Sequence, residues 1–242
     1  MSGKNSPSRI GIVFAQEMEA NGLRSAFNDS MLAERSKESA DTYQVGPLEI
    51  VIKTSGGGGA QCAAAVDQII QSGVDRVLIA GFAASLVSNG QAGDVLVAES
   101  IRTTDDSAPV LKCTRSLTSA APPDGTLGRS IGHGTLLTTD EHITSTAEKT
   151  WLAEKTGAAA VDTFSYASAQ VCSQAKVPFA CVKAISETLD QEMPQSTGGL
   201  AAAAQKLVSS SARKLSSQLR EQERAASTAL GDVLGIMVLR IG

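Results

Sequence analysis

Short apolar runs alternate with longer stretches of helical periodicity along the 242 residues. The run at 9–15 (RIGIVFA) is almost continuously apolar, which is typical of a strand covered on both faces. Further strands are expected at 48–54, 75–82, 94–99, 134–138, 158–161 and 177–186. Helices are expected at 17–27, 60–72, 145–156, 165–174 and 199–224. Ser145 and Thr146 with Glu148 resemble a capping box at the start of one of these helices.

This alternation predicts one α/β domain with a mostly parallel sheet. The polar residues 1–8 (MSGKNSPS) are expected to form a disordered tail, and 9–242 a single domain without a linker or repeat. Residues 101–130 carry Pro, Asp, Ser and Thr with weak periodicity, so they are expected to form a long loop with at most one strand.

The composition changes this picture at one point, because only 3% of the residues are aromatic. The core must be built mostly from Ala, Val, Ile and Leu, which favours helices that approach one another and the sheet closely. Four widely spaced cysteines form no CxxC pair, so neither a zinc ribbon nor a disulfide framework is expected. Cys172 and Cys181 lie in apolar runs and are expected to be buried.

Charge and hydropathy exclude several classes of partner. The net charge of −4 and the absence of a basic cluster argue against nucleic acid. No run reaches the roughly 18 apolar residues of a membrane span, and the apolar segment 233–241 is too short for one. Because no apolar segment follows a basic start either, we expect no signal peptide and a cytoplasmic protein.

Several familiar catalytic motifs are missing. The two histidines, His133 and His142, have no metal-ligand spacing, so no metal site is expected. There is no GxSxG elbow. The run Gly56–Gly59 is not followed by Lys-Ser/Thr and lacks the third glycine of GxGxxG, so neither a P-loop nor a dinucleotide site is indicated. The sequence therefore predicts no cofactor.

The glycine run nevertheless joins a predicted strand to a predicted helix, beside Ser55. Backbone N–H groups at such a helix N-terminus can hold a phosphate, a polarised water or a ribose hydroxyl. The same glycines can equally provide a turn that lets the following helix pack tightly on the sheet. Both interpretations stay open.

Three carboxylates follow the ends of predicted strands: Glu19, Asp162 and Glu187. Ligands of parallel α/β sheets collect outside the carboxyl ends of the strands. Each acid alone is as readily explained as a helix cap or a solvated side chain. Together they offer a general base and a general acid on one rim.

Four segments occur in the order and spacing of one family: IGIVFAQEMEANGL, TSGGGGAQCAAA, RVLIAGFAASLVSNGQAGDVLVAE and AAAVDTFSYASAQVCSQAKVPFACVKAISETLD. The chain resembles the purine nucleoside phosphorylase/uridine phosphorylase family, in particular its methylthioadenosine/S-adenosylhomocysteine nucleosidases. The resemblance implies a single-domain three-layer α/β/α sandwich around a mixed sheet. It also implies a homodimer, a small-molecule nucleoside as partner, and no metal or nucleotide cofactor.

The resemblance assigns roles to several residues. Glu19 corresponds to the family's acid that positions the attacking water. Ser55 and Gly56 fall on the turn that contacts water or phosphate and ribose. In the stretch TTDEHI, His142 takes the place of the ring that stacks on the purine, and the backbone of Ile143 faces the base.

Two further motifs of the family are altered in this sequence. The motif ISD, whose acid gives a proton to purine N7, is here ISE, with Ser186 before Glu187. The motif VEMEA or VDMES is here VDTFS, with Asp162, Thr163 and Phe164. Phe164 stands where the family has the acid that grips the ribose hydroxyls, and a phenyl ring cannot accept that hydrogen bond.

Three functions remain open at this point. The first is hydrolysis of the N-ribosidic bond of an adenosine-type nucleoside, with Glu187 as acid and Glu19 orienting water. The second is phosphorolysis, because residues 148–162 resemble hopanoid-associated nucleoside phosphorylases; Arg24, Arg102 and Arg115 are then the candidate phosphate ligands. The third is a non-catalytic nucleoside-binding protein, for which Phe164 is the main support.

Overall fold

A computed structural model describes residues 8–30, 33–35, 41–193 and 210–242, and the side chains of the last segment from residue 216. The strands are β1 (Ser8–Phe14), β2 (Ala33–Arg35), β3 (Thr42–Val45), β4 (Leu48–Thr54), β5 (Arg76–Ser85), β6 (Val95–Thr103), β7 (Leu111–Lys112), β8 (Ile131–Thr138), β9 (Ala160–Asp162) and β10 (Phe179–Glu187). The helices are α1 (Glu17–Asp29), α2 (Gly59–Gln71), α3 (Arg115–Thr118), α4 (Thr146–Thr156), α5 (Ser165–Ala175) and α7 (Ser210–Ile241).

These strands form one mixed sheet in the order β10-β6-β8-β9-β5-β1-β4-β3-β2, with β7 beside β6. β1 pairs in parallel with β4 and β5, and β5 pairs in parallel with β10. Since β10 also pairs antiparallel with β6, the strands β5, β10, β6, β8 and β9 close into a ring. The sheet is therefore mixed, as the family resemblance implies, with one parallel part at β4, β1, β5 and β10 and another at β6, β8 and β9.

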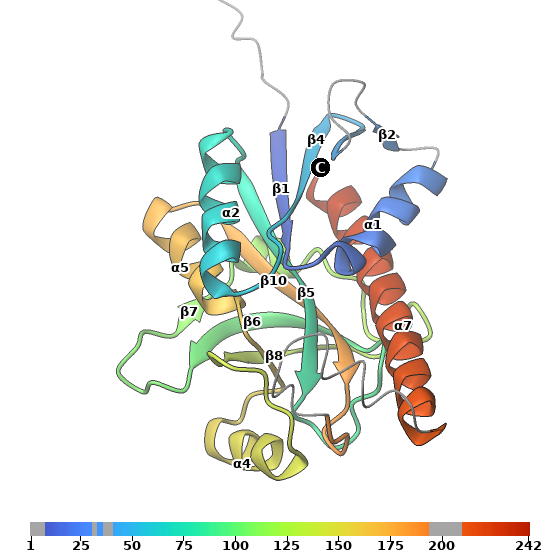
Figure 1. Ribbon diagram of the computed structural model, residues 1–242. Coiled ribbons are helices and arrows are strands. Elements are labelled where there is room, and N and C mark those ends of the chain that lie inside the picture. The colour runs from blue at the N-terminus through green and yellow to red at the C-terminus, as the bar shows by residue number, and fades with distance from the viewer. Residues whose placement is uncertain (1–7, 31–32, 36–40, 194–209) are drawn as a thin grey trace, which may run out of the picture.

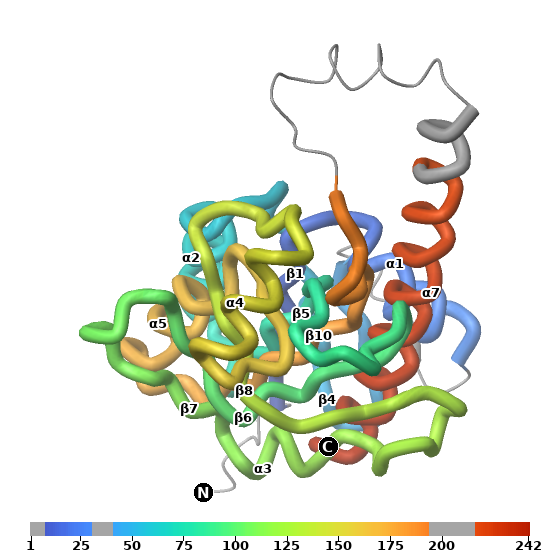
Figure 2. The backbone as a smooth tube through the Cα atoms, turned by 90° about the horizontal axis from the view of Figure 1, so that it is seen from below, coloured from blue at the N-terminus to red at the C-terminus, as the bar shows by residue number. Residues whose placement is uncertain are grey.

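Helices cover both faces of this sheet (Figure 1). α2 and α5 lie on one face, and α1 and α7 lie on the other. Figure 2 shows the same two pairs on opposite sides when the molecule is seen from below, with α4 towards the viewer. The three-layer α/β/α sandwich is thus confirmed, in one domain.

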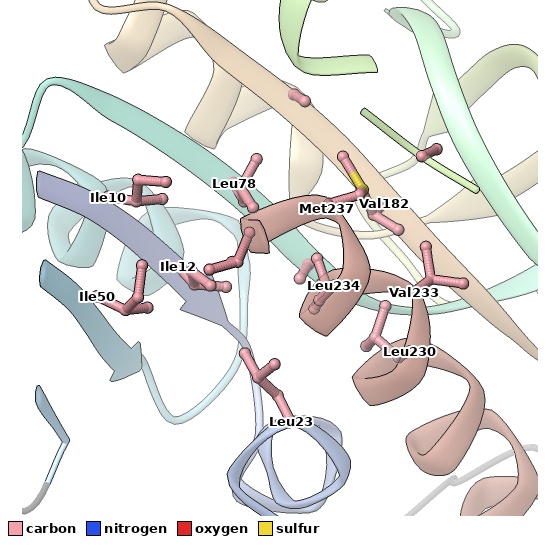
Figure 3. Packing of buried hydrophobic residues seen from close by; sticks show 14 of the residues in the cluster. Ile10, Ile12, Leu23, Ile50, Leu78, Val182, Leu230, Val233, Leu234 and Met237 are labelled. Atoms are coloured by element: carbon pink, nitrogen blue, oxygen red, sulfur yellow. The ribbon is translucent and has the colours of Figure 1, made fainter. Parts of the chain in front are cut away.

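Alternation within β1 explains the two layers of core. Ile10 and Ile12 point to the α1/α7 side, where they pack near Leu234 and Met237 (Figure 3). Val13 belongs to the cluster on the α2/α5 side, which also buries Cys172 and Cys181 as expected. A strand buried on both faces needs apolar residues in both registers, which is why its sequence is almost continuously apolar.

Small residues allow α1 and α7 to cross closely, as the aromatic-poor composition predicts. A Cβ on Gly22 would lie within 1.8 Å of the Ser227 carbonyl oxygen, and a Cβ on Gly231 within 2.3 Å of the Gly22 backbone. Ser227 Oγ accepts a hydrogen bond from the Gly22 N–H at 3.0 Å. α7 therefore docks on α1 by backbone contact, which a side chain at either glycine would prevent.

Differences from the expected elements are confined to three places. The 101–130 segment is more ordered than predicted, because β6 continues to Thr103 and β7 and α3 follow. β2 and β3, which extend the sheet edge, are absent from the expected elements because each is only three or four residues long. The last helix, expected over 199–224, runs from Ser210 to Ile241 in the described chain, and the apolar segment 233–241 is its core-facing end.

Parts of two predictions lie outside the described residues: positions 1–7 of the expected tail and positions 199–209 of the expected last helix. Ser8 is the first residue of β1. In the described part of the chain, no helix combines the length and hydropathy that crossing a membrane requires.

Candidate active site

Glu19 lies in the first turn of α1, directly after the carboxyl end of β1, and only 4% of it is exposed. Its two carboxylate oxygens accept backbone hydrogen bonds, Oε2 from the Gln16 N–H at 2.8 Å and Oε1 from the Phe82 N–H at 2.9 Å. Burial raises the pKa of Glu19, and the positive charge of Lys183 opposes this rise. The predicted water-positioning acid is therefore fixed by two strands, β1 through the helix start and β5 through Phe82.

Lys183, from the middle of β10, is fully buried beside this acid. Its Nζ lies 2.8 Å from Asp162 Oδ2 and 3.5 Å from the centroid of the Phe164 ring. Asp162 also accepts hydrogen bonds from Thr138 Oγ1 at 2.8 Å and Ser165 Oγ at 2.6 Å. Burial is the largest single effect and lowers the pKa of Lys183, but the negative charges around it, first that of Asp162 and then those of Cys181 and Glu19, together outweigh burial, so the pKa is raised.

Gly81 makes room for this cluster at the centre of β5. A Cβ at Gly81 would lie 2.8 Å from Glu19 Oε1 and 2.9 Å from Phe164 Cζ. Gly81 is also the residue in register with Lys183 on β10. Because Gly81 has no side chain, the Glu19 carboxylate, the Phe164 ring and the Lys183 ammonium can approach the same point of the sheet. We call these three residues, together with Asp162, the lysine cluster.

The glycine run adjoins the lysine cluster. Gly56, Gly57 and Gly58 all have positive φ, between 76° and 106°, and Gly58 is the N-cap of α2. The Gly57 N–H donates to Ser55 Oγ at 3.3 Å, and Ser55 Oγ lies 2.9 Å from Cys62 Sγ.

The backbone of Thr163 approaches the same turn, because its carbonyl oxygen would lie 3.5 Å from a Cβ on Gly59. The turn therefore allows the tight packing of α2 against α5 and also places Ser55 near the buried acids. Both interpretations of the glycine run are compatible with this geometry.

Glu187 ends β10, the strand that also carries Lys183. The pairing of β10 with β5 shifts by one residue between Ile185 and Glu187, so Ser186 forms a bulge, which re-aims the side chain that follows. Glu187 Oε1 lies 2.9 Å from His142 Nε2, whereas Glu187 Oε2 is buried and has no hydrogen-bond partner among the described residues. This hydrogen bond raises the pKa of His142, against the effect of burial.

Two more buried groups frame this second acid. Lys149, on α4, is fully buried, and its Nζ donates to the carbonyl oxygens of Thr188 at 2.9 Å and Gln191 at 2.7 Å. Ile143 packs in a small apolar cluster beside α4. The turn after Glu187 is thus tied to α4 by a lysine.

Residues 9–220 match the family model described as the phosphorylase superfamily. The chain belongs to the phosphorylase superfamily. Among solved structures, it is similar to futalosine hydrolase of Helicobacter pylori strain 26695, with TM-score 0.73 and 20% identity over 96% of this chain and 98% of that one. It is also similar to the methylthioadenosine/S-adenosylhomocysteine nucleosidase of Neisseria meningitidis, with TM-score 0.73 and 18% identity over 96% and 98%.

A third similar structure is a Helicobacter pylori nucleosidase mutant with 5′-methylthioadenosine in its active site. It has TM-score 0.73 and 21% identity, over 96% of this chain and 98% of that one. At these identities, the likenesses show a shared fold.

Within this phosphorylase-superfamily chain, the structure brings the predicted site residues together in two groups. Glu19, Asp162 and Phe164 meet around Lys183, with Ser55 and Thr163 nearby at the α2 turn. Glu187 and His142 meet at the end of β10. The edge of the His142 ring contacts the acid, a contact that the sequence prediction of a purine-stacking ring did not include.

Two buried lysines beside the candidate acids were missed by the sequence interpretation. Lys183 lies inside the apolar run VPFACVKAIS, and Lys149 lies in the helix sequence TAEKTW. A lysine in the middle of a fully apolar strand is a usable signal, because a buried ammonium needs a carboxylate or carbonyl partner. That signal indicates that the buried lysine has a partner, but it does not identify the partner residue.

Proposed function

We propose that this protein hydrolyses the N-ribosidic bond of an adenosine-type nucleoside, with Glu19 orienting the water and Glu187 protonating the leaving base. The observation that carries the proposal is the contrast between the two acids. Glu19 is sealed beside an ammonium, while Glu187 presents an unpartnered oxygen beside an imidazole. Pairs of carboxyl groups in contrasting environments are typical of separate base and acid roles.

The enzyme class follows from the family. As a member of the phosphorylase superfamily, the chain is an enzyme that acts on N-glycosyl bonds. An adenosine-type nucleoside as the substrate and water as the nucleophile are the two points that we propose.

Glu19 is suited to hold water. Each of its oxygens accepts one backbone N–H, and a carboxylate oxygen can accept more than one hydrogen bond, so acceptor capacity for water remains. Burial raises its pKa towards the operating range, where a carboxylate is a more effective base. The reaction needs Glu19 ionised, so we expect kcat/KM to fall as the pH drops through this raised pKa.

Glu187 is suited to give a proton. As the N-ribosidic bond breaks, its electron pair moves to the base, which needs a proton, and the ribose carbon needs a hydroxyl from water. Glu187 Oε2 has no protein partner, and one end of the carboxyl group is already held by His142. A base nitrogen in contact with Oε2 would complete its hydrogen bonding.

Water is favoured over phosphate by the pairing of two candidate arginines. Arg24 pairs with Glu17 at 2.6 Å and Asp41 at 3.0 Å, and Arg102 pairs with Asp106 at 2.8 Å. Arginines neutralised in this way would have to leave a carboxylate to bind phosphate. Arg115, the third candidate, lies on α3, which packs against the start of β10, Phe179, rather than its end at Glu187.

Incubation of the pure protein with 5′-methylthioadenosine, S-adenosylhomocysteine, futalosine and adenosine tests the proposal, with chromatography of the released base and sugar. We expect a free base and a free sugar in phosphate-free buffer. A sugar phosphate that appears only with added phosphate would establish phosphorolysis instead. Tight binding of a nucleoside by calorimetry, with no turnover at high enzyme concentration, would refute cleavage.

The proposal extends to assembly and location. The resemblance favours a homodimer, which light scattering of the pure protein tests directly. All four cysteines are free thiols, which is compatible with the reducing cytoplasm that we propose as the location. Fractionation of the source cells would contradict this if the protein appeared outside the cytoplasm.

A further inference from the structure

We propose that His142 is a positioning residue for Glu187, and that the two side chains together hold the proton destined for the leaving base. This inference rests on the proposed hydrolysis. The contact joins residues that are 45 positions apart, from the segment between β8 and α4 and from the end of β10. We call His142 and Glu187 the histidine–glutamate pair.

The geometry of the pair fixes the orientation of the carboxyl group. Nε2 of His142 lies 2.9 Å from Oε1 of Glu187, and the bulge at Ser186 sets the direction from which the side chain leaves the strand. Oε2 is then the oxygen without a protein partner, although it is buried. A buried acceptor left unmatched costs stability, so its retention indicates a ligand at that atom.

The two ends of the pair differ in their access to water. The side chain of Glu187 is 13% exposed, whereas that of His142 is 52% exposed. The imidazole can therefore exchange protons with solvent while Oε2 faces away from it.

Charged groups on every neighbouring element act on the pair. Lys149 of α4 opposes a positive charge on His142, and Glu187 favours it. Asp190 and Glu192 follow β10 and balance the charge of Lys149, and Glu223 of α7 adds a further negative charge near Glu187. The net effect of the hydrogen bond to Glu187, burial and the charges of Glu187 and Lys149 is to raise the pKa of His142 above 6.5. The hydrogen bond to Glu187 is the largest cause.

The proton count of the proposed step balances. The pair with one added proton exists as an imidazolium beside a carboxylate, or as a neutral imidazole beside a carboxyl group protonated on Oε2. In the second form, Oε2 gives its proton to the base as the bond breaks, and the new carboxylate keeps its hydrogen bond from His142 Nε2. Glu19 accepts the proton of the attacking water and releases it to solvent after the product leaves, and one proton from solvent returns to the histidine–glutamate pair.

Because His133 and His142 are the only histidines, NMR titration of the imidazole signals tests the pair without any substrate. The native protein should show His142 titrating above 6.5, and Glu187→Gln should move that titration down, since the amide removes the negative charge. The signals of His133 serve as the internal reference. A His142 titration that is unchanged by Glu187→Gln would overturn the pair.

Kinetics separate positioning from the stacking role that the sequence resemblance suggests. His142→Gln places an amide N–H where Nε2 was, and it should keep most of the plateau kcat while the alkaline limb of the pH profile moves to lower pH. His142→Phe keeps a ring but no donor, and it should lower kcat about tenfold to hundredfold with little change in KM. If His142→Phe kept the native kcat while His142→Gln lost it, the ring would act by stacking and the histidine–glutamate pair would be refuted. His133→Gln, at the other histidine, is the matched control.

The proposed hydrolysis and the histidine–glutamate pair would be refuted by different results. Absence of base release from every nucleoside, with the NMR shift present, would refute hydrolysis and the proton-delivery step together while leaving the contact itself. Base release with no NMR response would refute the pair alone.

Discussion

The two candidate acids, Glu19 and Glu187, occupy opposite kinds of environment. Glu19 is held by two backbone N–H groups in a sealed region whose nearest charge is an ammonium. Glu187 is held at one oxygen by a half-exposed imidazole and has its other oxygen free. The first environment keeps a carboxylate in place, and the second allows a proton to arrive and leave.

The comparison shows how one pair of identical side chains acquires two roles. Both acids are glutamates at the carboxyl ends of parallel strands, so their sequence positions do not distinguish them. Their partners do, because the pKa of the buried Lys183 ammonium beside Glu19 is raised, whereas the partner of Glu187 is an imidazole, the side chain that most readily exchanges a proton near neutral pH. The predictions below alter one side of this comparison at a time.

Glu19→Gln should have the largest effect on activity. The amide cannot accept the proton of the attacking water, so kcat should fall about 10²- to 10⁴-fold. Turnover of the best nucleoside substrate measures this. Glu17→Gln is the matched control on the same helical turn, since Glu17 pairs with Arg24 and Thr54 on the exposed side. Equal losses in the two variants would mean that the helix start, not Glu19, matters.

Lys183→Met should have the largest effect on stability. The substitution leaves the buried carboxylate of Asp162 without its counter-charge, and breaking a buried pair in this way costs about 3–5 kcal/mol. Urea unfolding of the native protein and the variant measures the difference in the free energy of unfolding.

Two controls make the Lys183 result specific to charge. Lys155→Met removes an exposed lysine that contacts the Trp151 ring, and it should change stability by less than about 1 kcal/mol. Adding Asp162→Asn to Lys183→Met should recover part of the loss, because the amide is neutral. No recovery would show that packing around the Phe164 ring, rather than charge, is responsible.

The sequence identified much of the fold but only part of the site, for physical reasons. Strands such as β1 and β10 are apolar in both registers because both faces are buried, and that pattern is local. β2 and β3 were missed because strands of three and four residues are too short for a pattern to stand out, although Tyr43 and Val45 of β3 alternate as buried positions. Glu19 and Glu187 were found because they follow strands.

The partners of the two acids depend instead on register. Lys183 meets Asp162 only because β10 and β9 both pair with β5, and His142 meets Glu187 only because of the bulge at Ser186. Neither the pairing nor the bulge is encoded in a short motif. The acids were therefore predictable, while the two buried lysines and the contacts that distinguish the acids were not.

Glu187→Asp should have an intermediate effect, although it restores the residue that the related family motif carries. Shortening the side chain withdraws the carboxyl group from His142 Nε2, which now lies 2.9 Å from it. Misplacement by about 1 Å can reduce the rate by as much as about a hundredfold, and we expect a loss of about tenfold in kcat. A variant as active as the native enzyme would show that the histidine–glutamate pair is dispensable.

The smallest expected effect concerns the ribose, and it tests the aromatic ring in the lysine cluster. Phe164 is buried with its ring facing the Lys183 ammonium, and it has no acceptor for a ribose hydroxyl. A site that hydrogen-bonds a hydroxyl rejects the analogue without it by about 10⁴-fold or more, whereas an apolar contact discriminates weakly. We therefore expect the kcat/KM values of adenosine and 2′-deoxyadenosine to differ by less than about tenfold.

Two substitutions show whether the ring is the cause of this tolerance. Phe164→Met keeps an apolar side chain without an acceptor and should leave the ratio of the two kcat/KM values unchanged. Phe164→Glu introduces a carboxylate beside Lys183 and should raise the preference for adenosine. Strong rejection of the deoxynucleoside by the native enzyme would instead mean that another acceptor grips the ribose. Asp162 would then be the first candidate, because it is the remaining carboxylate of the altered motif and its pairing with Lys183 would have to open to admit the sugar.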